Sequence, residues 1–389
     1  MTALKAEVEV HGRIADIGRE AWDRCATNPH NAYNPFVSFD FLDILEESGC
    51  AVERTGWAPR HLSVRDESGC VAAVAPLYAK SHSQGEYIFD HGWAEAYERA
   101  GGRYYPKLVS ASPFSPVTGP RLMTREQTDA DEARAMLLQG GTELCRRIGA
   151  SGFAVNFPLE SEWRFMGERG MLQRQSQQYH WLNGGYGTFD DFLAALSSAR
   201  RKTIRRERRD AQAGLEIRKL TGTDLSEDHW DAFFAFYMDT GSRKWGRPYL
   251  NRRFFSLLGE RMADKVLLVM AARQGRWIAG ALNFIGGDCL YGRNWGCLED
   301  VPFLHFELCY YQAIDFAIAR GLARVEAGAQ GQHKVSRGYL PTAVYSAHFI
   351  ADPALRGPVA RFLEAERRSV QGEMDWVAEE FSPFRQSGP

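Results

Sequence analysis

The stretch Lys265–Asp300, KVLLVMAARQGRWIAGALNFIGGDCLYGRNWGCLED, decides the fold. Its apolar and β-branched residues alternate with polar ones, and two glycine-containing breaks, Gln274-Gly275 and Gly286-Gly287-Asp288, divide it. Short alternating runs joined by such breaks are typical of β-hairpins. The stretch therefore predicts an antiparallel meander of three strands.

The earlier stretch 61–97, HLSVRDESGCVAAVAPLYAKSHSQGEYIFDHGWAEAY, has the same plan around a tight turn at Ser68-Gly69. Helical patterns precede and follow each meander, and a short strand closes each copy. The predicted helices are 19–26, 38–48 and 131–148 in the first copy and 227–243, 251–263 and 304–320 in the second, with closing strands at 153–157 and 323–328. The repeated order predicts an α/β (α+β) protein in which one unit is duplicated.

The first copy has an extra segment, residues 97–123, which is rich in aromatic residues, proline and glycine. It is predicted to form either an ordered functional loop or an edge strand with turns. With 389 residues the chain is too long for one ordinary core. We expect a first domain at 1–185 and a second at 186–389, the second with a basic connecting helix at 197–213 and a C-terminal helix.

The composition is 44% hydrophobic and 25% charged with a formal net charge of −2, so any anion site must be a local patch. Seven scattered cysteines without a C-x-x-C spacing favour reduced thiols, and hence the cytoplasm, over disulfides or a structural zinc site. No H-x-x-x-H spacing and no apolar run of bilayer length occurs, so neither a metal site nor a transmembrane segment is predicted. The oligomeric state stays open.

Several long segments rich in rare residues carry a family resemblance. They include NPFVSFDFLDILEESGC, KSHSQGEYIFDHGWAEAYERAGGRYYPKL, PFSPVTGPRL, FYMDTGSRKWGRPYL, HFELCYYQAIDFAI and EAGAQGQHKVSRGYLP, between about Trp22 and about Ile350. These segments resemble the bacterial family of FemAB-like N-acyltransferases. The order of elements is similar to that of the GNAT acyltransferase fold, duplicated as in the Fem-type peptidoglycan aminoacyltransferases.

The resemblance implies two tandem GNAT-like domains with mixed central sheets. It also implies transfer of an aminoacyl or acyl group to an amine acceptor, either a peptidoglycan-precursor-like molecule or a small amine. The donor is then aminoacyl-tRNA or acyl-CoA, and no tightly bound cofactor is expected. The alternative from another class is a non-catalytic protein that binds peptides or precursors.

The donor can be argued from one loop. GNAT relatives hold the CoA pyrophosphate on a glycine-rich turn after the fourth strand, where backbone N–H groups face the anion. Here Arg293-x-x-Gly296 matches the first half of that pattern, the second glycine is missing, and Glu299 and Asp300 follow. Two carboxylates repel a pyrophosphate. Because Fem-type enzymes use aminoacyl-tRNA without this turn, the sequence favours aminoacyl-tRNA over an acyl-CoA.

The run RRKTIRRERR, Arg200–Arg209, contains seven basic residues and one acid. If the helix continues through it, Glu207 has no basic neighbour three or four residues away, so most of the positive charge is left without a partner in the helix. Arg201, Arg205 and Arg208 are therefore candidates to contact tRNA phosphates or a diphosphate-linked acceptor. The alternative is a solvated connecting helix that pairs with acids elsewhere.

The segment HKVSRGYLP, 333–341, resembles the Fem/GNAT segment that borders the acyl-transfer site, with a tyrosine where Fem proteins usually carry phenylalanine. On that match Lys334 stabilises the oxyanion, Arg337 holds an acceptor carboxylate or phosphate, and Tyr339 contacts substrate. His333 is a candidate to accept the amine proton. Taken singly, each is as well explained as a surface residue.

Further candidates lie at strand ends and in a helix. Asp90 and His91 end the first meander as a carboxylate–imidazole base, unless they point to opposite faces of a strand. Arg293 and Trp295, at the end of the second meander, are expected to line the substrate cleft. In the helix that follows, Glu307 is a second candidate base, and Tyr311 a candidate proton donor; capping and core packing are the alternative.

A basic and aromatic corner, GSRKWGRPYL, closes the first helix of the second copy. Its side chains suit an anionic acceptor or a nucleotide, although turns collect basic residues in any case. The candidate substrate contacts there are Arg243, Lys244, Trp245 and Arg247.

Overall fold

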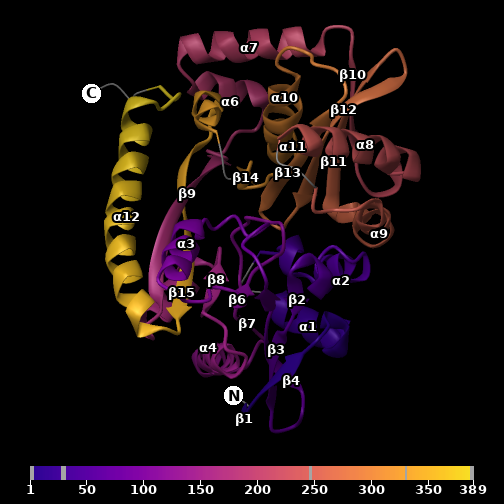
Figure 1. Ribbon diagram of the computed structural model, residues 1–389. Coiled ribbons are helices and arrows are strands. Elements are labelled where there is room, and N and C mark those ends of the chain that lie inside the picture. The colour runs from indigo at the N-terminus through magenta and orange to yellow at the C-terminus, as the bar shows by residue number, and fades with distance from the viewer. Residues whose placement is uncertain (1–3, 28–31, 245–247, 329–330, 386–389) are drawn as a thin grey trace. The chain divides into compact units, whose positions relative to one another are not determined.

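A computed structural model describes residues 4–27, 32–244, 248–328 and 331–385. The chain forms two compact units, the first made of 1–176 and 343–371 and the second of 177–342 and 372–389. Three elements pass from one unit into the other: β9 (Leu172–Leu182), β15 (Leu340–Ile350) and α12 (Pro353–Glu380) (Figure 1). Within the described residues, no helix has the length and apolar character to cross a bilayer.

The second unit contains the predicted meander. Strands β11 (Val266–Arg273), β12 (Arg276–Ile285) and β13 (Cys289–Cys297) are antiparallel neighbours, and β10 (Glu216–Leu220) pairs with β11. The first hairpin turns at Gln274 and Gly275, both with positive φ, which is why glycine is needed there. On the far side β14 (Arg324–Glu326) lies parallel to β13 and antiparallel to β9. The meander and its turns are confirmed.

Helices cover both faces of this sheet. α8 (Glu227–Lys244) crosses β12 and β13 and packs with α9 (Arg252–Met262) (Figure 1). The helix predicted at 304–320 is divided into α10 (Leu304–Phe306), a π turn (Glu307–Tyr311) and α11 (Gln312–Ala319). The unit also contains α6 (Phe189–Ala195), α7 (Ser198–Gln212) and a 3-10 helix, η7 (Gln332–Arg337). A π turn inside a helix frequently marks a functional site.

The first unit has two groups of strands. One has the order β1-β3-β4-β7: β1 (Leu4–His11), β3 (His61–Asp66), β4 (Val71–Ala75) and β7 (Met123–Thr124). The other has the order β15-β8-β6-β5-β2: β8 (Gly152–Asn156), β6 (Lys107–Ser110), β5 (Tyr78–Lys80) and β2 (Trp57–Pro59). Its helices are α1 (Arg19–Ala26), α2 (Phe39–Glu47), α3 (His91–Arg99), α4 (Ala130–Arg147) and α5 (Glu160–Glu168).

The first copy differs from its predicted plan in one strand. The hairpin of β3 and β4 forms with its turn near Gly69, but residues 86–90 form no strand and lead into α3. The missing strand is supplied by β6, inside the segment 97–123 that was expected to be a loop or an edge strand. β6 is central: it is antiparallel to β5 and parallel to β8. Four strand residues among prolines and glycines give too short a periodic signal to be recognised.

Gly296 allows a close approach of helix and strand in the second unit. A Cβ atom there would lie 2.3 Å from the carbonyl oxygen of Phe236 in α8. We expect Gly296→Ala to lower the free energy of unfolding by about 1–3 kcal/mol, because the helix must move away. Gly12→Ala, whose Cβ meets nothing within 4 Å, should change it by less than about 0.5 kcal/mol. Urea unfolding of both variants measures this, and equal stability of Gly296→Ala and the wild type would contradict the packing.

Candidate functional site

A cleft opens in the second unit where its two parallel strands separate. β13 and β14 pair from Cys289 opposite Arg324 to Tyr291 opposite Glu326, after which β14 ends and β13 continues to Cys297. The cleft beyond this point has a volume of about 90 Å³. Its lining includes Asn283, Gly292, Arg293, Asn294, Trp295, His305, Cys309, Tyr310 and Ala327. Arg293 and Trp295, expected from the sequence at this place, thus both face one cleft.

Lys334 contacts the lining of this cleft, and we define the rim as the η7 residues with such a contact. Its Nζ donates hydrogen bonds to the carbonyl oxygens of Ala327, a lining residue, and Gly328, at 2.7 and 2.9 Å. The side chain is buried, and burial lowers its pKa to about 8, with a smaller lowering from Arg293. The ammonium form therefore predominates at neutral pH, and among the described residues two of its three N–H groups have acceptors.

His333 lies on the same rim. Its Nε2 is 3.0 Å from the hydroxyl of Tyr310, which lines the cleft. Partial burial and the charges of Arg337 and Lys334 lower the pKa of His333 below its usual 6.5. The imidazole is therefore neutral at pH 7 and can accept a proton. An ammonium and a neutral imidazole thus stand on adjacent residues of η7.

Two buried carboxylates hold η7, the π turn and α7 together. Glu307, with no exposed surface, accepts hydrogen bonds from Nε and Nη2 of Arg208, both at 3.2 Å, and from Gln212 at 2.8 Å. Glu207 is 5% exposed and accepts from Nε and Nη2 of Arg337 at 3.2 and 2.8 Å and from the Tyr311 hydroxyl. Adjacent residues of α7 therefore form reciprocal ion pairs with the two segments that carry the cleft side chains.

These contacts give several candidate residues a different place from the one expected. The Arg337 guanidinium lies on Glu207 and not on the cleft, and the Tyr311 hydroxyl is hydrogen-bonded to the same carboxylate. The Glu307 carboxylate lies against Arg208. Tyr339 is fully buried, with its hydroxyl 3.5 Å from the Tyr310 carbonyl oxygen.

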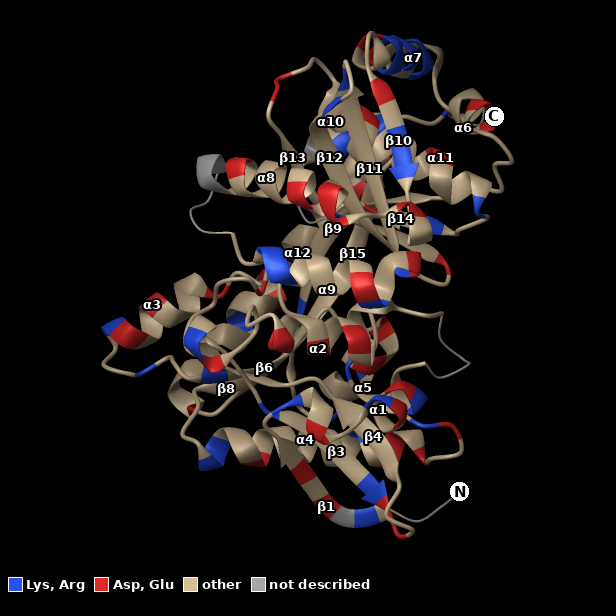
Figure 2. Ribbon diagram, turned by 90° about the vertical axis from the view of Figure 1, so that its right-hand side faces the viewer, with Lys and Arg blue, Asp and Glu red and all other residues tan. Residues whose placement is uncertain are grey.

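The basic helix keeps part of its charge at the surface. Figure 2 shows Lys and Arg along α7. Arg205 pairs with Asp190 at 3.2 Å, and Arg201 donates to the Ala194 carbonyl oxygen at 3.4 Å, whereas Arg208 is engaged with Glu307. Of the corner near α8, Trp245 and Arg247 lie outside the described residues, as do the side chains of Arg243 and Lys244.

The acidic loop is less repulsive than its sequence indicates. Arg273 and Arg276 both form ion pairs with Glu299, the former at 2.6 Å. The charge of this carboxylate is therefore offset locally, which weakens the argument against a pyrophosphate. Gly296 lies in β13 against α8 and not in a turn before a helix, so it does not contribute to a phosphate-binding loop.

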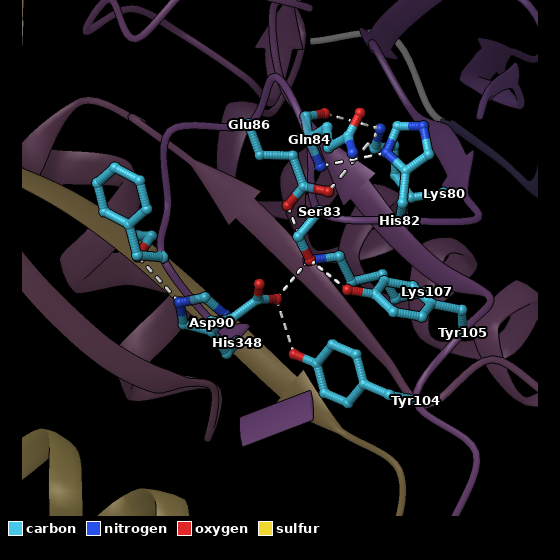
Figure 3. Close-up of polar contacts among 12 residues, drawn as sticks. Lys80, His82, Ser83, Gln84, Glu86, Asp90, Tyr104, Tyr105, Lys107 and His348 are labelled. Carbon is cyan, nitrogen blue, oxygen red and sulfur yellow. Dashed lines mark hydrogen bonds and ion pairs between the residues drawn. The ribbon is translucent and has the colours of Figure 1, made fainter. Parts of the chain in front are cut away.

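The first unit buries a charged cluster, the Lys107 cluster, made of Lys80, Ser83, Glu86, Asp90, Tyr104 and Lys107 (Figure 3). Lys107 Nζ donates to Ser83 and Glu86 at 2.8 Å and to Asp90. The Tyr104 hydroxyl donates to Asp90 at 2.8 Å. Asp90 is the residue before α3, and its carboxylate faces Lys107 and Tyr104, whereas His91 begins the helix and is exposed. The expected Asp90–His91 base is therefore not formed.

Burial shifts the protonation of this cluster. Burial and the charge of Lys107 outweigh Glu86 and lower the pKa of Lys80 to about 7, although its Nζ lies 4.0 Å from Glu86 and 3.5 Å above the Trp57 ring. Burial also raises the pKa of Glu86, while Glu86 and Asp90 overcome burial and raise the pKa of Lys107. The sequence pointed to only Asp90 here. The available signal was the polar run KSHSQGE at 80–86, in the stretch that also carried the family resemblance.

The shifted pKa of Lys80 predicts a pH-dependent stability. Between pH 7 and the ordinary value of 10.5 the folded protein releases a proton that the unfolded chain keeps, so this residue makes stability rise with pH. We expect the wild type to gain unfolding free energy relative to Lys80→Met between pH 6.5 and pH 9, as measured by urea unfolding. Lys202→Met, at an exposed position of α7, serves as the control and should show no such trend. A constant difference between the wild type and Lys80→Met would contradict the shift.

Comparisons with known proteins identify a family and a fold. A FemAB-like family model, described as peptidoglycan biosynthesis/recognition, matches residues 13–386. The crystal structure of FemX is similar with a TM-score of 0.56 at 11% identity, covering 91% of this chain and 100% of that chain. The structure of L-PGS from Bacillus licheniformis is similar with a TM-score of 0.51 at 9% identity, covering 86% and 98%. A search of curated proteins finds no match.

At these identities the structural likeness shows the fold alone. It agrees with the mixed sheets and parallel strand pairs described above, and the predicted fold class of two tandem GNAT-like units is confirmed. The family match extends over nearly the whole sequence. The chain therefore belongs to the FemAB-like family.

Proposed function

We propose that this protein is an N-acyltransferase that moves an aminoacyl or acyl group from an activated donor to an amine at the cleft of the second unit. The observation that carries the proposal is that two adjacent residues of η7 contact the lining of the cleft where β13 and β14 separate, Lys334 at the Ala327 carbonyl oxygen and His333 at the Tyr310 hydroxyl. Membership of the FemAB-like family supports it.

The chemistry needs three events. The amine nitrogen attacks the donor carbonyl carbon, a C–N bond forms, and the carbonyl oxygen becomes an oxyanion. The remaining N–H of Lys334 is the donor for that oxyanion, and a preformed donor of this kind contributes about 10²–10³ in rate. His333 takes the proton released by the amine, and the donor's oxygen or sulfur then leaves and takes up a proton.

The acceptor and donor are proposed by analogy with the family. The family description supports an amine on a peptidoglycan precursor as the acceptor. Aminoacyl-tRNA is the donor of Fem-type enzymes, and the basic surface of α7 is suited to the phosphates of such a donor. An acyl-CoA donor is the second candidate. The observation in its favour is the pairing of Glu299 with Arg273 and Arg276, which lowers the repulsion of a pyrophosphate.

Native mass spectrometry followed by a transfer assay tests this function. The purified protein is mixed with acetyl-CoA or with charged tRNA at low and moderate salt, and then with an amine-bearing peptidoglycan precursor or a pool of small amines. We expect one donor to be retained and its acyl group to appear on an amine. Retention of tRNA that weakens as the salt concentration rises supports aminoacyl-tRNA as the donor. Retention of CoA supports an acyl-CoA. Failure of both donors to react with any amine would exclude the proposed activity.

The two rim residues predict a bell-shaped pH profile. As pH rises through about 8, Lys334 loses its proton and kcat/KM should fall; as pH falls below the lowered pKa of His333, the base is lost and kcat/KM should fall again. Lys334→Arg should lose the alkaline limb because arginine does not deprotonate in this range. Lys334→Met should lower kcat by about 10²–10³.

The surface lysine Lys265 provides the matched control. Lys265→Met should retain both limbs of the pH profile of kcat/KM and the full kcat. Circular dichroism checks that every variant is folded. An unchanged alkaline limb in Lys334→Arg would remove Lys334 from the mechanism.

A further inference from the structure

A second pocket of the second unit has walls from three separate segments. Its volume is about 250 Å³. It is lined by Trp376, from α12, and the following Phe381, by Arg200 of α7 and His333 of η7, and by the buried side chains of Val335 and Val377. The backbone fixes these walls, since Ser197 donates to the Pro383 carbonyl oxygen at 2.9 Å and Arg385 to that of Ala195 at 3.0 Å.

The two aromatic side chains are unusually open to solvent. Trp376 is 54% and Phe381 46% exposed, and their rings meet edge to face with centroids 4.8 Å apart. Neighbouring exposed aromatic rings are typical of ligand surfaces, because leaving them in water is unfavourable. The volume is below that of a pocket for a whole drug-sized ligand, roughly 300–1,000 Å³, and is suited to one planar ring system.

Arg200 gives the pocket a positive edge. Among the described residues no hydrogen bond or ion pair engages its guanidinium, in contrast to Arg205 and Arg208 of the same helix, which have carboxylate partners. A guanidinium without a carboxylate partner next to two exposed aromatic rings is suited to a phosphate attached to a planar base.

The pocket adjoins the proposed reaction site through His333. This residue lines the pocket, and its Nε2 contacts the Tyr310 hydroxyl on the wall of the cleft. A donor with its ring system in the pocket would therefore pass His333 on its way to the cleft. The pocket is at one end of that route, and the acyl carbonyl belongs at the other.

We propose that this pocket binds the adenosine phosphate of the acyl donor, with the adenine stacked on Trp376 and Phe381 and a phosphate at Arg200. The proposal rests on the proposed function, because both donor classes carry this group: the aminoacylated end of tRNA is an adenosine, and CoA contains adenosine 3′,5′-phosphates. The pocket takes the place of the glycine-rich phosphate loop that the second unit lacks.

Calorimetric titration of the full chain tests the pocket directly. The probes are adenosine 3′,5′-bisphosphate, which represents CoA, and the trinucleotide CCA, which represents the tRNA end; uridine 3′,5′-bisphosphate is the base control. We expect one adenosine probe to bind, and Trp376→Ala to weaken it at least about fivefold. Arg200→Gln should weaken the phosphorylated probes and leave the affinity for adenosine unchanged.

The matched control is Phe362→Ala. Phe362 is a similarly exposed aromatic residue of α12 outside the pocket, and this variant should bind the probes with an affinity within about twofold of the wild type. Both α12 positions are exposed, so both variants should fold, and Phe381→Ala repeats the test at the second aromatic ring. The probe that binds more tightly identifies the donor class.

The failures can be told apart. Three results would each overturn the pocket assignment. They are equal binding of the probes by the wild type and Trp376→Ala, no binding of either adenosine probe at millimolar concentration, and a protein dimer that binds no nucleotide and that Trp376→Ala abolishes. Transfer activity with an unchanged donor KM in Trp376→Ala would overturn it while leaving the function standing. Nucleotide binding without any transfer would leave the pocket standing and reject the function.

Discussion

The reciprocal pairing of two buried carboxylates organises the second unit. Glu207 and Glu307 are removed from water, which is unfavourable for a charge unless it is paired and hydrogen-bonded. Arg337 and Arg208 supply those partners, and in doing so join α7, the π turn and η7. The rim residues His333 and Lys334 are thus positioned by ion pairs that never touch the cleft. The basic run serves two purposes, since one of its arginines is used inside the fold while others remain in solvent.

The parts of this structure that were predictable are those with a local signal. The alternation of apolar and polar residues around the turns Gln274-Gly275 and Gly286-Gly287 specified the second meander. Arg293 and Trp295, on the last strand of that meander, line one cleft as a result. The partner of Glu207 was not predictable, because Arg337 is 130 residues away and long-range ion pairs leave no periodic pattern. The same holds for Lys107 with Glu86 and Asp90, whose common feature is burial and not spacing.

The two copies share a backbone feature, a pair of parallel strands, and differ in the side chains beside it. Each has one parallel strand pair, β6 with β8 and β13 with β14. In the second unit the separation beyond the pair leaves about 90 Å³ open. Beside β6 and β8 the cavity bordered by Asp90, Tyr104, Lys107 and His348 measures about 20 Å³, room for a single water molecule. The interior of the first copy is thus closed by charge pairs, whereas the interior of the second keeps an open cleft.

The path of the chain between the units constrains how the protein can be made. The first unit is interrupted after Ser176 and is completed by 343–371, so Ala347 and Leu363 join its hydrophobic cores only after residues 177–342 of the second unit have been synthesised. During translation the early residues emerge from the ribosome with part of their apolar surface uncovered. A fragment that stops near the middle of the sequence therefore lacks a strand and a helix of its own core, and no single cut of the chain separates the two units.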